Sequence, residues 1–311
     1  MYSLTVINSM VVIFTLAVPG FAFRKLGLAD EHQLKTMSSF MMNIILPAII
    51  IQSMQINFSK EILISGAKIF LAVFIMFFVV LGFSVVFSKS ASIGTKNTGL
   101  VAFMLFFANT GGIGIPVMKM LFGNEAVFYA SSVEIAVDIL IFTGGVLLMQ
   151  SSSENKKVNF NIRALISPGT LGIVCGLILF VTGIRLPDIL NNVFNHLSEA
   201  SLAVTMFVIG AQIGAVKFKK MLYEKRMYYV TAAKLIVIPV IMFAITYFLR
   251  CSFMPSLVLT VLFAMPTGGA AVIFANEYGT DDIFAAEVVF LTDVCSLFTI
   301  PVFMILINSI T

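Results

Sequence analysis

Three acidic residues lie inside stretches that are otherwise strongly apolar: Glu134, Asp138 and Asp293. Glu134 and Asp138 are four residues apart, so on a helix they share one face. A carboxylate in a membrane is costly, and it usually pairs with a base, faces water or carries a proton. We therefore predict a coupling role for all three residues, with structural pairing as the alternative. Lys68 and Lys234 also lie in apolar stretches and are candidate partners.

The string TGG occurs twice in apolar stretches, at residues 110–112 and 267–269. Each glycine costs a helix about 1 kcal/mol relative to alanine, and Pro266 removes a backbone donor beside the second string. Pro116 suits the first turn of a restarted helix, where a proline has no needed donor to lose. The sequence thus predicts a broken helix at each string. Glycine-rich kinks that only allow close helix packing are the alternative.

The predicted breaks, near residues 109–115 and 265–269, would form a binding site. Backbone groups released from a helix inside a membrane must find partners or line a wet cavity. The N-terminus of each restarted half-helix has free N–H groups and partial positive charge, which favours an anion. Asn43, four residues before Pro47, is a further polar candidate. The predicted substrate-binding residues are Asn43, Asn109, Thr110, Gly111, Gly112, Thr267, Gly268 and Gly269.

The composition defines the setting of these residues. Hydrophobic residues make up 59% of the 311 and charged residues 11%, whereas a soluble domain carries about 25% charged residues. A water-soluble fold would have to expose much of this apolar surface, which argues against that class. We predict an all-α integral membrane protein with ten spans, because apolar runs of about 20 residues recur along the chain. The spans are placed at roughly 4–23, 34–54, 63–87, 99–121, 126–150, 166–184, 198–216, 229–250, 256–278 and 283–307.

The Lys and Arg residues are distributed unevenly between the connecting segments. Thirteen lie in one set of alternate loops and four in the other. Because positively charged loops stay in the cytoplasm, both termini are predicted to face outside, in the cytoplasmic membrane. The net charge of +4 then reflects orientation rather than a nucleic-acid partner. Only two His and three Cys occur, scattered along the chain, so no metal site or cofactor is expected.

The two halves of the chain, residues 1–150 and 151–311, resemble one another in three places that follow the same order. These matches predict a duplicated five-helix unit. Because five is odd, the second copy enters the membrane inverted, an arrangement that is characteristic of secondary transporters. The matching pairs are SGAKIF with TAAKLI, FFANTGGIGIPV with FAMPTGGAAVIF, and LAD with LPD.

Three strings resemble the auxin efflux carrier family and its bacterial members: NIILPAII (43–50), ANTGGIGIPV (108–117) and AMPTGGAAVIFANEYG (264–279). The resemblance covers essentially the whole chain and implies a fold related to bile acid:sodium symporters, in which the fourth and ninth helices cross at their breaks. It implies elevator-like movement of the crossed helices past a scaffold of the first, second, sixth and seventh helices. By the matching motif, Asn109 would face the substrate, with Pro116 and Pro266 at the crossing.

The resemblance also implies a cargo. Bacterial members are thought to move small carboxylates such as malate, malonate or oxalate, so the predicted function is secondary active transport of a small organic anion. The chain departs from the plant carriers because residues 151–163 are its only counterpart of their long central loop, so hormone transport is not expected. A proton is the expected coupling ion, and scaffold helices could pair in a homodimer.

Sodium-coupled symport of an organic anion, of the bile-acid type, is the main alternative. Such symporters carry acidic and polar sodium ligands in the fourth and ninth spans, whereas Glu277 is the only acid expected near either break here. A membrane enzyme is not expected, because the spans contain no HExxH motif and no Ser–His pair. The lack of an appended output domain disfavours a receptor without transport.

Overall fold

The computed structural model describes residues 11–12, 15–57, 59–90, 97–153, 167–215 and 225–310. These residues form helices and short connections, and none of them belongs to a strand longer than an isolated bridge. This part of the chain is therefore an all-α membrane protein, as predicted. Six helical segments are long and apolar enough to cross a membrane: His32–Ser53, Lys60–Lys89, Thr110–Ser152, Asp188–Ala215, Lys225–Phe248 and Asp282–Phe303.

The helices of the first half follow the predicted apolar runs. Gly123 lies in the left-handed region with a φ of 74° and bends α7 between the fourth and fifth predicted spans, a conformation that glycine adopts without steric cost. The helices in order are α2 (Ala17–Lys25), α3 (Glu31–Phe40), η1 (Met41–Ile45), α4 (Leu46–Ser53), α5 (Lys60–Ser90), α6 (Thr98–Phe106), η3 (Thr110–Gly114), α7 (Ile115–Leu140), η4 (Ile141–Gly145) and α8 (Val146–Ser152).

The second half differs from prediction mainly at α10, which begins at Asp188 and not near residue 198. The segment 188–197 contains three asparagines and a histidine, so its low hydropathy concealed a helix that extends beyond the apolar run. The helices in order are α9 (Pro168–Thr182), α10 (Asp188–Ala215), α12 (Lys225–Ala232), η6 (Ala233–Val237), α13 (Ile238–Phe248), α14 (Phe253–Phe263), α15 (Ala270–Glu277) and α16 (Asp282–Ile310).

Three wide helical turns precede prolines. The π-helical turns η1, η3 and η6 are each followed by a helix with a proline in its first two positions, namely Pro47, Pro116 and Pro239. A proline clashes with the carbonyl four residues earlier and donates no hydrogen bond. A wider turn makes room for its ring, so these helices bend without ending.

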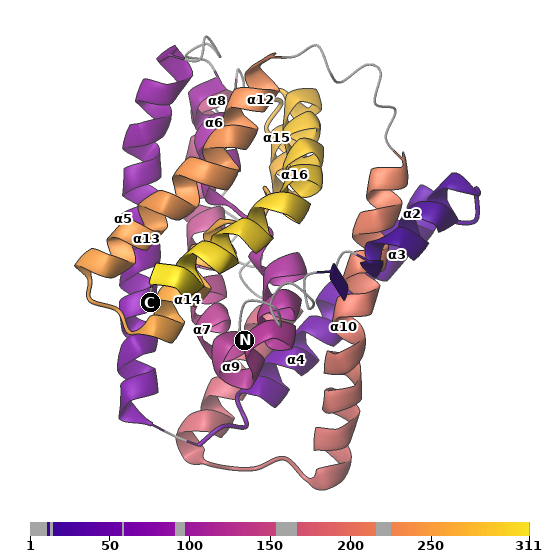
Figure 1. Cartoon of the computed structure of the whole chain (residues 1–311), viewed down its shortest axis with the longest axis vertical. Helices are drawn as coiled ribbons and strands as arrows, with labels where there is room; N and C mark the ends of the chain where they lie inside the picture. Colours follow the sequence, from indigo (N-terminus) through magenta and orange to yellow (C-terminus); the bar gives the residue numbers. More distant parts are fainter. Residues whose placement is uncertain are drawn as a thin grey trace.

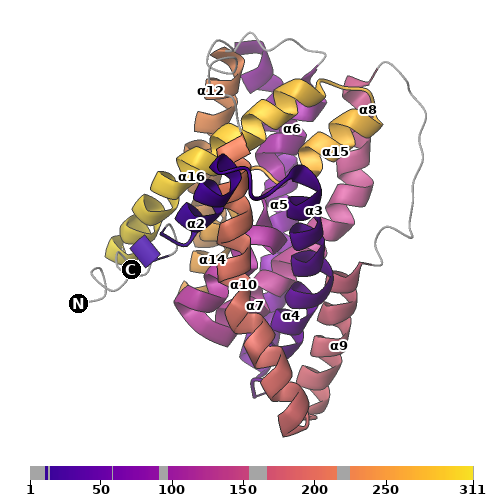
Figure 2. The same ribbon diagram turned by 90° about the vertical axis from the view of Figure 1, so that its right-hand side faces the viewer.

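The helices pack as two groups, which Figures 1 and 2 show from two sides. In the first, here named the α10 group, α10 packs against α2 and α4, and α4 packs against α9. The second, here named the break group, contains α5 to α8 and α12 to α16 with their π-helical turns. In both views α4 and α9 lie toward one end of the molecule, and α6, α8, α12 and α15 lie toward the other.

Small residues hold the α10 group together at very short range. A methyl group added to Gly20 of α2 would clash with the backbone of Phe207, and one added to Gly210 of α10 would clash with the backbone of Ala17. Gly172 of α9 packs in the same way against Pro47 of α4. Such close backbone contact is typical of helices that associate inside membranes. The helices of this group are therefore held together by direct contact between their backbones.

The outer face of α9 is apolar and unpacked within the chain. Leu171, Val174, Ile178 and Val181 are all more than half or about half exposed and recur every three or four residues. A stripe with this spacing lies on one helix face. In a protein of this composition the face is suited to contact with lipid.

Candidate functional site

The site lies where two helices are interrupted beside one another. The helix α6 ends at Phe106 and η3 begins at Thr110, while α14 ends at Phe263 and α15 begins at Ala270. We name residues 107–109 the first break and residues 264–269 the second break. The second break agrees with the predicted residues 265–269. The first break, predicted near residues 109–115, lies just before its TGG string, and that string forms the π-helical turn η3.

The two breaks are hydrogen-bonded to each other through their backbones. Ala108 and Thr267 form an isolated antiparallel bridge. The Asn109 N–H donates to the Pro266 carbonyl at 2.8 Å, and the Gly268 N–H donates to the Phe107 carbonyl at 2.9 Å. Backbone groups released from both helices therefore satisfy one another. Pro266, which has no N–H, takes part only as an acceptor.

Side chains from the second half of the chain complete the end of α6. The ammonium group of Lys234, a fully buried residue of η6, donates to the Leu105 carbonyl at 2.9 Å. The Thr267 hydroxyl donates to the Met104 carbonyl at 3.0 Å. The last carbonyls of a helix lack intrahelical partners and carry partial negative charge, so a buried ammonium group is well placed there.

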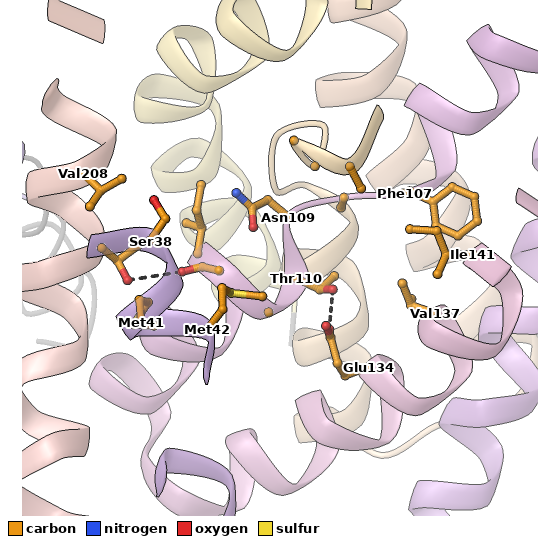
Figure 3. A pocket seen from close by; sticks show the side chains of 18 of the residues that line it. Ser38, Met41, Met42, Phe107, Asn109, Thr110, Glu134, Val137, Ile141 and Val208 are labelled. Atoms are coloured by element: carbon orange, nitrogen blue, oxygen red, sulfur yellow. Dashed lines mark hydrogen bonds between the residues drawn. The ribbon is translucent and has the colours of Figure 1, made fainter. Parts of the chain in front are cut away.

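The half-helices that restart after the breaks open into a cavity of about 500 Å³ between the α10 group and the break group. Gly111 and Gly112 of the first half-helix and Gly268 and Gly269 of the second line it. Both half-helix N-termini thus contribute N–H groups at the cavity wall. Most other lining residues are apolar, and Figure 3 shows Phe107, Val137 and Ile141 on one side and Met41, Met42 and Val208 on the other.

Glu134 stands at the N-terminus of the first half-helix. The Thr110 hydroxyl donates to Glu134 Oε2 at 2.5 Å, as Figure 3 shows. A methyl group added to Gly111 would lie 2.7 Å from Glu134 Oε1. This contact corrects the expectation that Glu277 is the only acid near either break. Glu134 follows Gly123 in α7, and the bend at Gly123 allows it to approach the start of the same helix.

Asp138 faces a different helix. The Thr170 hydroxyl, in the first turn of α9, donates to Asp138 Oδ2 at 3.1 Å. The hydroxyl of Ser167, which caps the N-terminus of α9, lies 2.8 Å from that of Thr170. Asp138 thereby joins the break group to the α10 group. The two carboxyl groups of Glu134 and Asp138 are close enough to repel one another.

Two further contacts shape the cavity floor. The Thr205 hydroxyl of α10 donates to the Gly112 carbonyl at 3.2 Å. The Asn109 amide covers the other side of Gly112, so closely that a methyl group there would clash with it. The Asn109 side chain lies between Ser38 and Thr110 in Figure 3. Asn109 is therefore a polar group at the centre of the lining.

Most of the predicted site residues meet in this cavity. Asn109, Thr110, Gly111, Gly112, Gly268, Gly269, Glu134 and Asp138 all line it.

Three predicted residues lie elsewhere. Asn43 is exposed on η1, donates to the Ser39 hydroxyl at 2.9 Å and lines a separate surface pocket beside His32. Thr267 is fully buried, and its N–H donates to the Thr292 hydroxyl at 3.1 Å, so this N–H is not free to bind a molecule in the cavity. Asp293 is buried and absent from the lining.

Three hydroxyl residues of the lining or its surroundings were missed by sequence reasoning: Ser38, Thr170 and Thr205. For Thr170 a local signal exists, because Ser167 and Pro168 mark a helix N-terminus. That signal does not reveal which carboxylate approaches the helix. Among the described residues, no cluster of three or more His, Cys, Asp or Glu could hold a metal ion.

Comparison with known proteins gives a consistent assignment. Residues 5–304 match the sequence model of a family described as "Membrane transport protein". An uncharacterized transporter of Methanothermobacter thermautotrophicus is 20% identical over 301 residues, which cover 95% of this chain and 96% of that protein. The uncharacterized transporter YfdV of Escherichia coli K12 is 30% identical over 136 residues, 42% of each chain.

Proposed function

Because the chain belongs to the auxin efflux carrier-like family of membrane transport proteins, we propose that it is a secondary active transporter of a small organic anion. The observation that carries this proposal is the meeting of two half-helix N-termini at one cavity between two groups of helices. Helix N-termini favour negative charge. The volume of about 500 Å³ falls in the usual range for small-molecule sites.

The proposed architecture has ten spans in two inverted five-helix repeats, residues 1–150 and 151–311. The paired breaks and the equivalent places of the two TGG strings support it. In this proposal the break group moves as the transport domain past the α10 group, which is the scaffold. Inverted repeats with a site at discontinuous helices are typical of alternating access.

The cavity opens toward one side in the proposed orientation. Its lining uses the later part of α10, up to Gln212, and the part of α3 and η1 from Ser38 to Met42. These segments lie near the loops whose Lys and Arg residues predict the cytoplasmic side. At the opposite end, Lys119 of α7 donates to Gln52 of α4 at 2.6 Å and joins the two groups. We propose that this arrangement is the inward-facing one, in the cytoplasmic membrane with both termini outside.

The proposed cargo is a mono- or dicarboxylate of the malate, malonate and oxalate class. Asn109 and the four cavity glycines would bind it, with Pro116 and Pro266 maintaining the breaks. Glu134 and Asp138 would provide proton coupling. Sodium coupling remains the second candidate, because the carboxylate and hydroxyl oxygens of Glu134, Asp138 and Thr110 are of the type that hard cations prefer.

The test is ligand-induced thermal stabilisation of the purified protein with a panel of mono- and dicarboxylates, each with and without sodium. A ligand at a hundredfold excess over its Kd stabilises by about 2.7 kcal/mol, which is readily measured. Stabilisation by one carboxylate that is lost in Asn109→Ala supports the proposal. Stabilisation by sodium or neutral solutes alone, with no response to any carboxylate, contradicts it.

A further inference from the structure

The N-termini of the two half-helices differ in what occupies them. A methyl group added to Gly269, at the start of α15, would meet no atom within 4 Å. The same addition at Gly111 would meet the Glu134 carboxylate, which also accepts the Thr110 hydroxyl. One N-terminus is therefore open to the cavity, and the other already holds an acidic group of the protein itself.

Within the part of the chain that the structure describes, no Lys or Arg lines the cavity beside this acid. The residues that line the cavity include Glu134 and Asp138 but no Lys or Arg. Asp138 is the one charged group that acts on Glu134 among the described residues, and it acts by repulsion. An anion entering the cavity would meet two carboxylates with the same sign of charge.

Uncharged groups donate to the two carboxylates. The Thr110 hydroxyl of the η3 turn donates to Glu134, and the Thr170 hydroxyl of α9 donates to Asp138. In α4, α9 and α14 no residue is Asp, Glu, Lys or Arg. Apart from Glu134 and Asp138, the Asp, Glu, Lys and Arg residues of α5, α7 and α10 lie outside the cavity lining: Lys60, Glu61, Lys68, Lys89, Lys119, Glu125, Asp188 and Glu199.

We propose that the Glu134 carboxylate is a tethered competitor of the anionic cargo at the first half-helix N-terminus. This inference rests on the proposed function. With Glu134 ionised, its oxygens take the Thr110 hydroxyl and the positive end of the half-helix, and they exclude an anion. When a proton from the aqueous phase binds Glu134, the charge is removed and the Thr110 hydroxyl is released to donate to the cargo.

The proton and the anion then cross together. On the far side the cargo leaves, Glu134 returns its proton to water, and the carboxylate again takes the Thr110 hydroxyl. One proton accompanies each anion at this residue, so a proton gradient drives uptake. The competition explains how two carboxylates and an anion site occupy one cavity.

The test measures anion binding against pH for the purified full-length protein. A panel of acetate, lactate, oxalate, malonate and malate is screened by thermal stabilisation from pH 5 to pH 8, without sodium. In the wild-type protein, the Kd of the anion that binds should rise about tenfold per pH unit once Glu134 is ionised, as expected for one linked proton. In Glu134→Gln the Kd should stay within about twofold over the whole range.

Matched variants separate this role from a structural one. Glu134→Asp keeps a titratable group and should keep the pH slope, whereas Glu61→Gln, on the exposed start of α5, should leave the slope and the Kd unchanged. Thr110→Val keeps the shape of the side chain and removes the hydroxyl. It should weaken anion binding at low pH, and it provides an independent test if Glu134→Gln does not fold.

A second readout uses proteoliposomes. Glu134→Gln should keep exchange of the anion across the membrane but lose accumulation driven by a proton gradient. Anion binding that is equally tight at every pH in wild type, or dependent on sodium and not on pH, would overturn the inference and leave anion transport standing. If no anion of the panel stabilises wild type or Glu134→Gln at any pH, anion transport itself is wrong and the competitor role with it.

Discussion

Both breaks adjoin a TGG string, which follows the first break and lies within the second, but the side chains there differ in polarity. Thr110, directly after the first break, contacts Glu134 at the cavity, and Asn109 lines the same space. Thr267 of the second break is fully buried and bonded to Met104 and Thr292. The TGG strings therefore accompany an interrupted helix in both places, whereas the side chains around them make different contacts. Polar side chains at the first break face the cavity, and Thr267 at the second break bonds to neighbouring helices.

Among single substitutions, the largest expected effect on the transport rate comes from obstructing the first half-helix N-terminus. A matching substitution at the second N-terminus is the control. Gly111→Ala places a methyl group against the Glu134 carboxylate, whereas Gly269→Ala places one in open space. Overpacking of this kind costs about 1–3 kcal/mol, which corresponds to a roughly ten- to hundredfold loss of transport rate if the strain acts on the working cavity. Gly269→Ala keeps the backbone N–H that would bind the cargo, and no protein atom opposes its methyl group, so its transport rate should stay within about twofold of wild type.

The measurement is the initial rate of anion uptake into proteoliposomes, with equal insertion of both variants checked by protease accessibility. Equal losses in the two variants would remove the difference between the breaks. Replacing the pairs Gly111–Gly112 or Gly268–Gly269 by leucines should abolish transport in either case, since both N-termini are then obstructed.

Lys234 and Lys68, whose sequence neighbourhoods match, should differ in how much they contribute to the stability of the protein. Lys234→Met removes the donor to the Leu105 carbonyl and leaves that acceptor buried, at a cost of about 1–3 kcal/mol. Lys68→Met affects an exposed lysine with a long contact of 3.5 Å to the Arg250 carbonyl, so little change is expected. The Tm in detergent compares the two variants. A Lys234→Met protein as stable as wild type would show that the end of α6 needs no donor.

The two threonines should separate function from stability. Thr267→Val removes the hydrogen bond to the Met104 carbonyl and should lower stability by about 1 kcal/mol, without altering the pH dependence of anion binding. Thr110→Val should change stability little and should weaken anion binding at low pH. Tm and pH-dependent Kd, measured on both proteins, test this division. Equal changes in Tm and in the pH dependence of Kd for the two variants would mean that the two breaks are functionally equivalent.

The smallest effect is expected for Asp293→Asn. The sequence predicts a coupling role for Asp293, but the residue is buried outside the cavity, and among the described residues its Oδ1 has no hydrogen-bond partner. We expect the pH profile of transport to coincide with that of wild type. A flattened profile would assign the coupling proton to Asp293, in the second half of the chain, and weaken the contrast between the breaks.

Sequence patterns predict the frame of this molecule well and the site only in part. Pro266 and the glycines beside it locate the second break, because backbone chemistry acts locally, whereas the first break lies just before its TGG string. The side-chain partners do not follow from local pattern: Thr170 meets Asp138 from 32 residues away through the packing of α9 on α7. Asn43 illustrates the same limit, since the rotation of η1 turns it outward. Helix rotation and contacts between helices depend on the whole fold.

The backbone contact between α2 and α10 has a mechanical consequence. At Gly20 and Gly210, the backbones of α2 and α10 are in direct contact. Because no side chain lies between them, a change of rotamer cannot separate the two helices. On the cavity face, among the described residues, the Thr205 hydroxyl of α10 donates to the Gly112 carbonyl of η3, a bond worth about 1 kcal/mol. In the proposed elevator movement, α10 would therefore stay attached to α2, while the neighbouring half-helix would give up little hydrogen-bond energy in moving along the other face of α10.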